Sequence, residues 1–373
     1  MPRTLRLLAD DLTGALDSAA AFGTLDSPVP VTWKMGNTLP HGPLAFDTGT
    51  READPRRAAE TVKRVASPLF ALPDALAYKK VDSLLRGSEA EEIAAVLEHN
   101  LFSRCVIAPA FPAQGRVSRG GRQGMAMPDG RWEALRTDLA ARLEEAGHAV
   151  ARCDPGDPMP LGVSFWNSES DADLDMVAAA ASHGEGILFV GSGGLAAALA
   201  RRFVRPHEAA APPRRGPLLG LFGTDHPVML AQLEAVTGHR LVIETADHAD
   251  AVQHLLQTTG TAFVTVALPD ETPRATAAIR IGQVLGELAT RLAPPGTLMV
   301  AGGETLRGLC EALGTQRLDV VGEIMPGIPR SRLVGGRWDG TDVISKSGAF
   351  GAPSLLATLL AADTPPLSGA TLP

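Results

Sequence analysis

Residues 5–22 read LRLLADDLTGALDSAAAF, and this stretch decides the fold of the first part of the chain. Its first five residues are mostly apolar and predict a short buried strand, and the residues after the two aspartates predict an apolar helix that Gly23 can end. Asp10 and Asp11 therefore lie where a strand leads into a helix, which is the edge of an open α/β sheet where ligands bind. Adjacent carboxylates repel each other and lose hydration there, so a metal ion, a ligand hydroxyl or cations must use them. The simpler alternative is that one aspartate only caps the helix.

Length and charge restrict the class of protein. A chain of 373 residues is too long for one compact core, so two domains are expected. The net charge of -8 and the pI near 5.6 argue against nucleic acid or an anionic membrane as a partner and favour a small molecule. No secretory signal is evident, no apolar run approaches the roughly 20 residues that cross a bilayer, and the three cysteines are far apart in the sequence. These features predict a reduced, cytoplasmic protein.

Strand and helix patterns alternate along most of the chain, which predicts an α/β fold made of two α/β domains. We expect the first domain over residues 1–205. Residues 206–216 are rich in proline and alanine and predict a linker. The alternation starts again in a second domain over 217–365, and residues 366–373 form a loose tail.

The most specific local pattern is KKVDSLLRG, residues 79–87. It gathers cations, a carboxylate and a hydroxyl, which an anionic ligand with several hydroxyl groups needs. A solvated charged turn is the alternative interpretation. Arg51 follows another predicted strand, so both elements point to the same edge of the sheet.

Glycine-rich turns between a strand and a helix form a second class of candidate site. They occur at 191–194, at Gly223 and at 302–305, and glycine there lets a phosphate approach the backbone and the helix N-terminus closely. A tight connection also needs glycine, and for 191–194 the two interpretations are about even. The turn at 302–305 follows a clear strand, and its glutamate and threonine supply side-chain oxygens. Residues 344–351, ISKSGAFG, could also wrap a phosphate or simply lead into the last helix.

Several known sites are excluded as motifs. The chain has no G-x-x-x-x-G-K-[ST] stretch, so it lacks a P-loop. A phosphatase-like D-x-D-x-T pattern nearly fits residues 9–13, but Ala9 takes the place of the nucleophile. The nine histidines show no zinc-binding spacing.

Taken together, the motifs resemble those of the four-carbon acid sugar kinases, a family that includes threonate, erythronate and 3-oxo-tetronate kinases. They occur in the order of that family and span nearly the whole chain: ADDLTGALDSA (9–19), the element ending at Arg51, KKVDSLLRG (79–87), APAFPAQGRVSRGGRQ (108–123), VGSGGLA (190–196), the turn at Gly223, AGGET (301–305), PGIP (326–329) and SKSGAFG (345–351). Each motif alone is weak, and together they are specific.

The resemblance implies an N-terminal domain that binds the acid sugar, a C-terminal domain that binds ATP, and Mg²⁺ with the nucleotide. The substrate residues expected are Asp10, Arg51, Lys80, Val81, Asp82, Ser83 and Arg86, with Asp11 first and Asp82 second as the group that orients or deprotonates the hydroxyl. The nucleotide residues expected are Thr224, His226, Gly302, Gly303, Glu304, Thr305, Lys346 and Gly348. We assign no metal ligand. The oligomeric state is open, with a homodimer as one option.

Two other classes stay open at this point. A nucleotide-dependent oxidoreductase could use the turn at 191–194, although no G-x-G-x-x-G is followed by a ribose-binding acid at the usual distance. A non-catalytic or regulatory protein that binds a small ligand would also suit two domains.

Overall fold

The computed structural model describes residues 4–36, 38–127, 129–180, 186–203, 216–269 and 272–361. The chain divides into two compact units, Met1–Glu208 with Arg317–Pro326, and Ala209–Gln316 with Gly327–Pro373. We expected all of 217–365 to form one domain, but the segment Arg317–Pro326 belongs to the first unit. Residues 206–215 of the predicted linker and the predicted tail lie outside the described residues.

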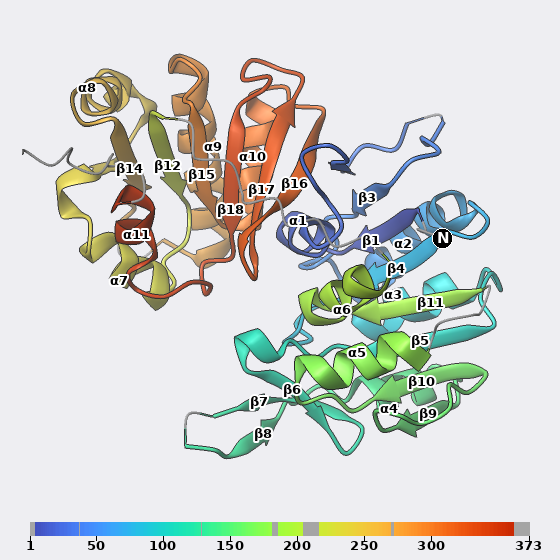
Figure 1. Cartoon of the computed structure of the whole chain (residues 1–373). Helices are drawn as coiled ribbons and strands as arrows, with labels where there is room; N and C mark the ends of the chain where they lie inside the picture. Colours follow the sequence, from blue (N-terminus) through green and yellow to red (C-terminus); the bar gives the residue numbers. More distant parts are fainter. Residues whose placement is uncertain are drawn as a thin grey trace, which may run out of the picture. The chain divides into compact units, whose positions relative to one another are not determined.

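The first unit is built on a mostly parallel sheet with the strand order β9-β10-β5-β11-β4-β1-β3-β2-β16 (Figure 1). Its strands are β1 (Leu5–Ala9), β2 (Val29–Thr32), β3 (Leu44–Asp47), β4 (Leu76–Lys80), β5 (Arg104–Ala108), β9 (Val150–Cys153), β10 (Gly162–Trp166), β11 (Ile187–Gly191) and β16 (Arg317–Met325). β16 pairs with β2 in the antiparallel direction, and β1, β3, β4, β5 and β11 are parallel to their neighbours. The carboxyl ends of these five strands therefore lie at one edge.

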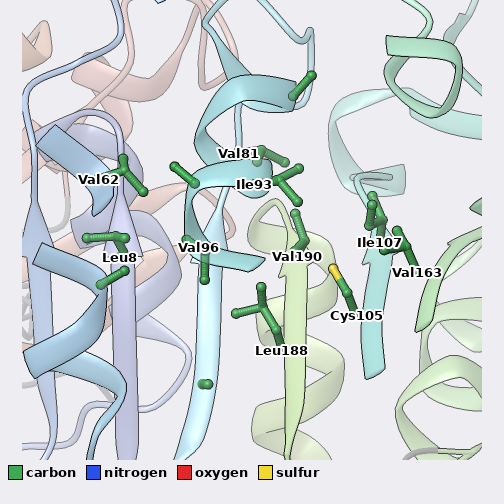
Figure 2. Close-up of a cluster of buried hydrophobic side chains, with 14 of the residues drawn as sticks. Leu8, Val62, Val81, Ile93, Val96, Cys105, Ile107, Val163, Leu188 and Val190 are labelled. Carbon is green, nitrogen blue, oxygen red and sulfur yellow. The ribbon is translucent and has the colours of Figure 1, made fainter. Parts of the chain in front are cut away.

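Helices cover both faces of this sheet. They are α1 (Leu12–Ala20), α2 (Pro55–Phe70), α3 (Glu89–Leu97), α4 (Leu139–Glu145), α5 (Asp171–Ala180) and α6 (Gly193–Phe203). α6 packs against α1 and α5, and α3 packs against α2 and α4. A core of buried apolar side chains fills the space between the strands and α2 to α4; Figure 2 shows Leu8, Val62, Ile93 and Val190 within it. The near-continuous apolar sequence of β1 and β11 follows from burial on both faces.

The stretch 109–124 contains regular structure that we did not expect. A short 3-10 turn, η1 (Pro112–Gln114), leads into a three-stranded antiparallel sheet of β6 (Arg116–Arg119), β7 (Arg122–Ala126) and β8 (Trp132–Ala134). The sequence of this stretch shows no strand or helix periodicity that would have predicted this structure. The strands are too short and too polar to give a periodic pattern, and buried Val117 and Gln123 are what anchor them.

The second unit has a sheet of order β13-β14-β12-β15-β18-β17 (Figure 1). Its elements are β12 (Leu218–Phe222), α7 (Pro227–Glu234), η2 (Thr237–His239), β13 (Arg240–Ile243), η3 (Ala246–His248), α8 (Ala249–Thr259), β14 (Thr261–Val266), α9 (Arg274–Arg291), β15 (Thr297–Ala301), α10 (Gly303–Ala312), β17 (Ile328–Val334), β18 (Asp342–Lys346) and α11 (Leu355–Ala361). β12, β15 and β18 are parallel neighbours, so the turns that follow them lie at one edge. In the part of the chain that the structure describes, no helix is both long and apolar enough to span a membrane.

Candidate functional site

The first candidate site lies at the carboxyl ends of β1, β3 and β4, where Arg51 meets three aspartates. Its guanidinium binds Asp10 through two nitrogens, with Nη2 2.8 Å from Oδ1. The same Nη2 donates to Asp11 Oδ1 at 2.9 Å, and Nη1 lies 3.9 Å from Asp82 Oδ1. Arg51 thus joins the ends of three strands, as its position after a predicted strand indicated. Its charge is already balanced by protein carboxylates.

Asp10 and Asp11 are adjacent but chemically different. Burial raises the pKa of Asp10, but the charge and hydrogen bonds of Arg51, with the charges of Lys79 and Lys80, outweigh it and hold that pKa below its ordinary value. Burial and the neighbouring charge of Asp10 raise the pKa of Asp11 above its ordinary value. Asp11 is also the more accessible, with 22% of its side chain exposed against 4% for Asp10.

Asp11 also caps α1. Its Oδ1 accepts a hydrogen bond from Gly14 N at 2.9 Å, as an N-cap residue does. The capping interpretation is therefore correct for Asp11, but it does not account for the contact with Arg51. One oxygen, Oδ1, makes both interactions, so Oδ2 is left to face a ligand.

Asp82 lies in the turn after β4 and is held by cations. Arg86 donates to both of its oxygens, at 2.5 and 3.0 Å. Burial raises the pKa of Asp82, but Arg86 and Arg51 outweigh it, so its pKa is lowered. Gln123 of β7 fixes the same turn by donating to the carbonyl of Ser83 at 2.9 Å. Gln123, the last residue of the 108–123 motif, therefore helps to position the turn that carries Asp82.

The two lysines of β4 point to opposite faces of the sheet, as consecutive strand residues must. Lys79 Nζ is fully buried and lies 2.7 Å from Glu92 Oε2 of α3, and Thr50 donates to the other oxygen of Glu92. Lys80 lies on the α1 side and donates to the carbonyl of Val81 at 2.9 Å. A Cβ on Gly14 would come within 2.5 Å of Asp11 Oδ1 and 3.0 Å of Lys80 Nζ, so a side chain at this position would displace both groups.

Sequence reasoning missed three ionisable groups at this edge. Burial raises the pKa of Glu89 to about 7, although a hydrogen bond from Gly87 N favours the ionised form. Burial, together with the negative charges of Glu323 and Asp11, raises the pKa of Asp17 to about 7. Arg116 of β6 is close enough to Asp82 for their charges to interact. Glu89 and Asp17 belong to α3 and α1, and carboxylates on helices are usually solvated, so no sequence pattern pointed to them.

The second candidate site lies at the carboxyl ends of β12, β15 and β18, where three glycine turns meet. A Cβ on Gly223 would come within 2.1 Å of Thr305 Oγ1, and one on Gly348 within 2.5 Å of Thr224 Oγ1. Gly302 has φ +109°, a conformation that side chains disfavour, and it precedes α10 without a side-chain cap. The free amides at the start of α10 suit a phosphate.

The buried cation Lys346 lies at this second site. Lys346 ends β18, donates to the carbonyl of Ser347 at 3.0 Å, and has a pKa that burial lowers to about 8. His226 caps α7 through Nδ1, 3.3 Å from Val228 N. Glu304 and Thr305 lie in the first turn of α10. The structure therefore gathers all the nucleotide residues expected from the sequence within one unit.

The glycines at 191–194 have a packing role instead. A Cβ on Gly191 would come within 2.7 Å of Ala108 O, and one on Gly194 within 2.5 Å of Ala110 O. The structure therefore favours the tight connection over a phosphate turn here. Within the described ranges, no cluster of three or more His, Cys, Asp or Glu side chains is arranged to hold a metal ion.

Comparison with known proteins agrees with this division. A family model of a sugar-binding N-terminal domain matches residues 5–161, and one of a nucleotide-binding C-terminal domain matches 226–356. A D-threonate kinase from Cupriavidus necator is 31% identical over 94% of this chain and 95% of its own length. The chain belongs to the four-carbon acid sugar kinase family. The resemblance noted in the sequence is confirmed.

Other relatives of this acid sugar kinase family member are more distant. A D-threonate kinase from Bordetella bronchiseptica is 28% identical over 94% of the chain and 95% of its own length. A D-erythronate kinase from Heliobacterium modesticaldum is 26% identical over 92% of the chain and 93% of its own length. A solved structure from Salmonella typhimurium LT2 has the same fold, with a TM-score of 0.75 at 19% identity, covering 94% of this chain and 97% of that one.

Proposed function

We propose that this protein transfers the γ-phosphoryl group of ATP to a hydroxyl of a four-carbon sugar acid of the threonate or erythronate type. The observation that carries the proposal is the Asp11 carboxylate, which has a raised pKa, is partly exposed and lies among cations at the carboxyl edge of the unit that matches a sugar-binding domain. The kinase names of the relatives support the reaction class.

The reaction forms a bond between the substrate oxygen and phosphorus and breaks the bond between the γ-phosphorus and the β–γ bridging oxygen. The hydroxyl proton passes to a base and ADP leaves. Asp11 is the base: its raised pKa moves it toward the range in which a carboxylate accepts a proton effectively. Asp82 is the weaker candidate because Arg86 holds both of its oxygens.

The carboxylate of the substrate is held by cations at the same edge. Arg86 is the most accessible of them, with 61% of its side chain exposed. Arg51, already bound to protein carboxylates, orients Asp11 and keeps Asp10 ionised, and Lys80 adds positive charge from the α1 side. The main-chain and hydroxyl groups of Val81 and Ser83 can bind substrate hydroxyls.

The nucleotide is held in the second unit. Backbone amides of the turns at Gly302, Gly303 and Gly348 bind the phosphates, Lys346 supplies a positive charge, and the hydroxyls of Thr224 and Thr305 and the ring of His226 complete the site. Mg²⁺ bound with the phosphates would neutralise charge on the transferring group. Glycine at 223 and 348 lets these turns pack against Thr305 and Thr224, because a Cβ there would come within 2.1 Å and 2.5 Å of their Oγ1 atoms.

An ADP-release assay with Mg-ATP tests the proposal. The substrates are D- and L-threonate, D- and L-erythronate, 3-oxo-tetronates and branched oxo-acids of similar size. Turnover that depends on one sugar acid establishes the reaction and names the substrate. Absence of turnover across the panel, with no ATP binding by calorimetry, would refute the kinase assignment.

A further inference from the structure

Glu89 is a buried carboxyl group at the start of α3, beside the first candidate site. The residue is 2% exposed, and its Oε1 accepts a hydrogen bond from Gly87 N at 2.8 Å. Its Oε2 is buried and has no hydrogen-bond partner among the residues that the structure describes. Leaving a buried polar atom unpaired costs free energy, so this carboxyl group calls for an explanation.

Ion pairs link the other acidic residues of this region to each element packed against α3. Glu91 pairs with Arg142 of α4, Glu92 with Lys79 of β4, and Glu98, just after the end of α3, with Lys63 of α2. The charges of these acids are therefore balanced by cations.

The charged groups that face Glu89 favour its neutral form. Burial raises its pKa to about 7, and the negative charges of Asp10 and Asp82 act in the same direction, whereas two backbone amides oppose them. The cations at this edge are engaged with those aspartates: Arg51 binds Asp10, and Arg86 binds Asp82. Glu89 is therefore mostly a neutral carboxylic acid below about pH 7 and an anion above it.

Gly87 is the point where Glu89 meets the pair of Arg51 and Asp10. A Cβ on Gly87 would lie 3.3 Å from both Glu89 Oε1 and Asp10 Oδ2, and 3.5 Å from Arg51 Cδ. The hydrogen bond from Gly87 N to Glu89 therefore holds the turn between β4 and α3 beside this pair. The residue before Gly87 is Arg86, the accessible cation of the same edge.

We propose that Glu89 is a positioning residue of the sugar-acid site: as a neutral carboxylic acid it holds the turn that carries Arg86, and it keeps a further negative charge away from an anionic substrate. It acts through the turn and the local charge, and not by contact with the substrate. The proposal rests on the proposed function, because it takes the ligand of this edge to be a sugar acid.

A purely structural role of Glu89 requires the opposite charge state. The N-cap of α3, Ser88, makes no side-chain hydrogen bond, so an ionised Glu89 would serve as a cap that the helix dipole stabilises. Glutamine in place of an ionised cap weakens the helix, whereas glutamine in place of a neutral acid removes the cost of ionising it. Glu89→Gln therefore separates the two roles by the sign of its effect.

Calorimetric titration of Glu89→Gln with D-threonate and D-erythronate tests the proposal at about pH 6 and about pH 8, on either side of the pKa of Glu89. Glutamine keeps an acceptor for Gly87 N and cannot ionise. At the lower pH we expect the affinity of the unmodified protein. At the higher pH we expect about three- to tenfold tighter binding than in the unmodified protein, which then carries the extra negative charge.

Two further variants complete the titration. Glu89→Ala removes the acceptor for Gly87 N and should bind the acids about three- to tenfold more weakly than Glu89→Gln at both pH values. Glu91→Gln makes the matched change in the same turn of α3, where the acid pairs with Arg142, and should bind like the unmodified protein.

The melting temperature provides a measurement without a ligand. The unfolded chain releases the proton of Glu89 near pH 4.5 and the folded protein near pH 7, so this group destabilises the fold increasingly as pH rises between these values. The melting temperature of Glu89→Gln should therefore rise relative to that of the unmodified protein across this range and keep its gain above it.

The outcomes separate this inference from the proposed function. If no sugar acid binds or is turned over, both fail. If an acid binds and Glu89→Gln follows the unmodified protein at both pH values, the inference fails alone, and any pH dependence belongs to another group such as Asp17. Equal losses of affinity in Glu89→Gln and Glu89→Ala would also overturn it. So would a melting temperature of Glu89→Gln that falls relative to the unmodified protein as pH rises, because Glu89 would then act as an anion.

Discussion

The two candidate sites differ in the groups that form them: charged side chains in the first unit and backbone turns in the second. At the edge of the first unit, Arg51, Arg86 and Lys80 face Asp10, Asp11 and Asp82, and the site is a network of paired charges. In the second unit, backbone turns at Gly223, Gly302 and Gly348 lie at the same edge as the buried cation Lys346. Paired side chains can select and orient a small acid, whereas backbone amides suit the repeated, identical groups of a phosphate chain. The following experiments separate the roles of the residues at the two sites.

The largest effect is expected for Asp11→Asn. Asparagine can still cap α1 by accepting from Gly14, but it cannot take a proton, so kcat should fall by about 10²–10⁴-fold. ATP affinity, measured by calorimetry, should stay the same because the second unit is untouched. Asp54→Asn makes the same change at the exposed N-cap of α2 and should leave kcat unchanged. An unaltered kcat in Asp11→Asn would remove this aspartate from the mechanism.

Gly348→Val should damage the second site selectively. The new Cβ would come within 2.5 Å of Thr224 Oγ1 and displace the turn, so we expect ATP affinity to fall by about tenfold or more. Binding of the sugar acid to the first unit should persist in the same calorimetric experiment. Gly238→Val, where a Cβ meets nothing within 4 Å, is the control. Equal ATP affinity in Gly348→Val and its control would show that the turn does not contact the nucleotide.

The neighbouring lysines of β4 should separate stability from substrate binding. Lys79→Met leaves Glu92 buried without its partner, so the free energy of unfolding in urea should fall by about 3–5 kcal/mol. Adding Glu92→Leu should restore much of that loss. Lys80→Met should instead raise KM for the sugar acid and cost less stability. Equal effects of the two substitutions on both quantities would contradict the assignment of the lysines to opposite faces.

The smallest effect is a pH dependence from Lys346. Its pKa of about 8 means that its charge is lost as pH rises through 8, so ATP affinity should fall by up to about tenfold per pH unit above that value. Between about pH 8 and 10.5, Lys346 is protonated in the unfolded chain but neutral in the folded protein. The free energy of unfolding should therefore rise with pH across this range. Lys346→Arg should abolish the step in ATP affinity. A step that persists in this variant belongs to another group.

The sequence was informative where chemistry and periodicity coincided. The strand before Asp10 and the strand before Gly302 are mostly apolar and are followed at once by polar or glycine residues, so both the fold class and the edge that carries each site could be predicted. The presence of Arg51 at the same edge as Asp10 followed from its place after a strand.

Other features depend on contacts that no local pattern records. β16 belongs to the first unit because it pairs with β2, far away in the sequence. The ion pair of Lys79 with Glu92 turns one of two adjacent lysines into a structural residue, and strand alternation would have indicated that only one could face the ligand. The raised pKa of Asp17 comes from burial, which its helical sequence did not reveal.

Transfer of the phosphoryl group itself is the most direct test. The protein is incubated with D-threonate or D-erythronate and ATP labelled in the γ-phosphate, and the labelled products are followed by phosphorus NMR. The account predicts a labelled phosphate monoester of the sugar acid that forms with ADP in equal amounts, and that forms about 10²–10⁴-fold more slowly with Asp11→Asn. Label that appears only in inorganic phosphate, at the same rate with and without the acids, would contradict it.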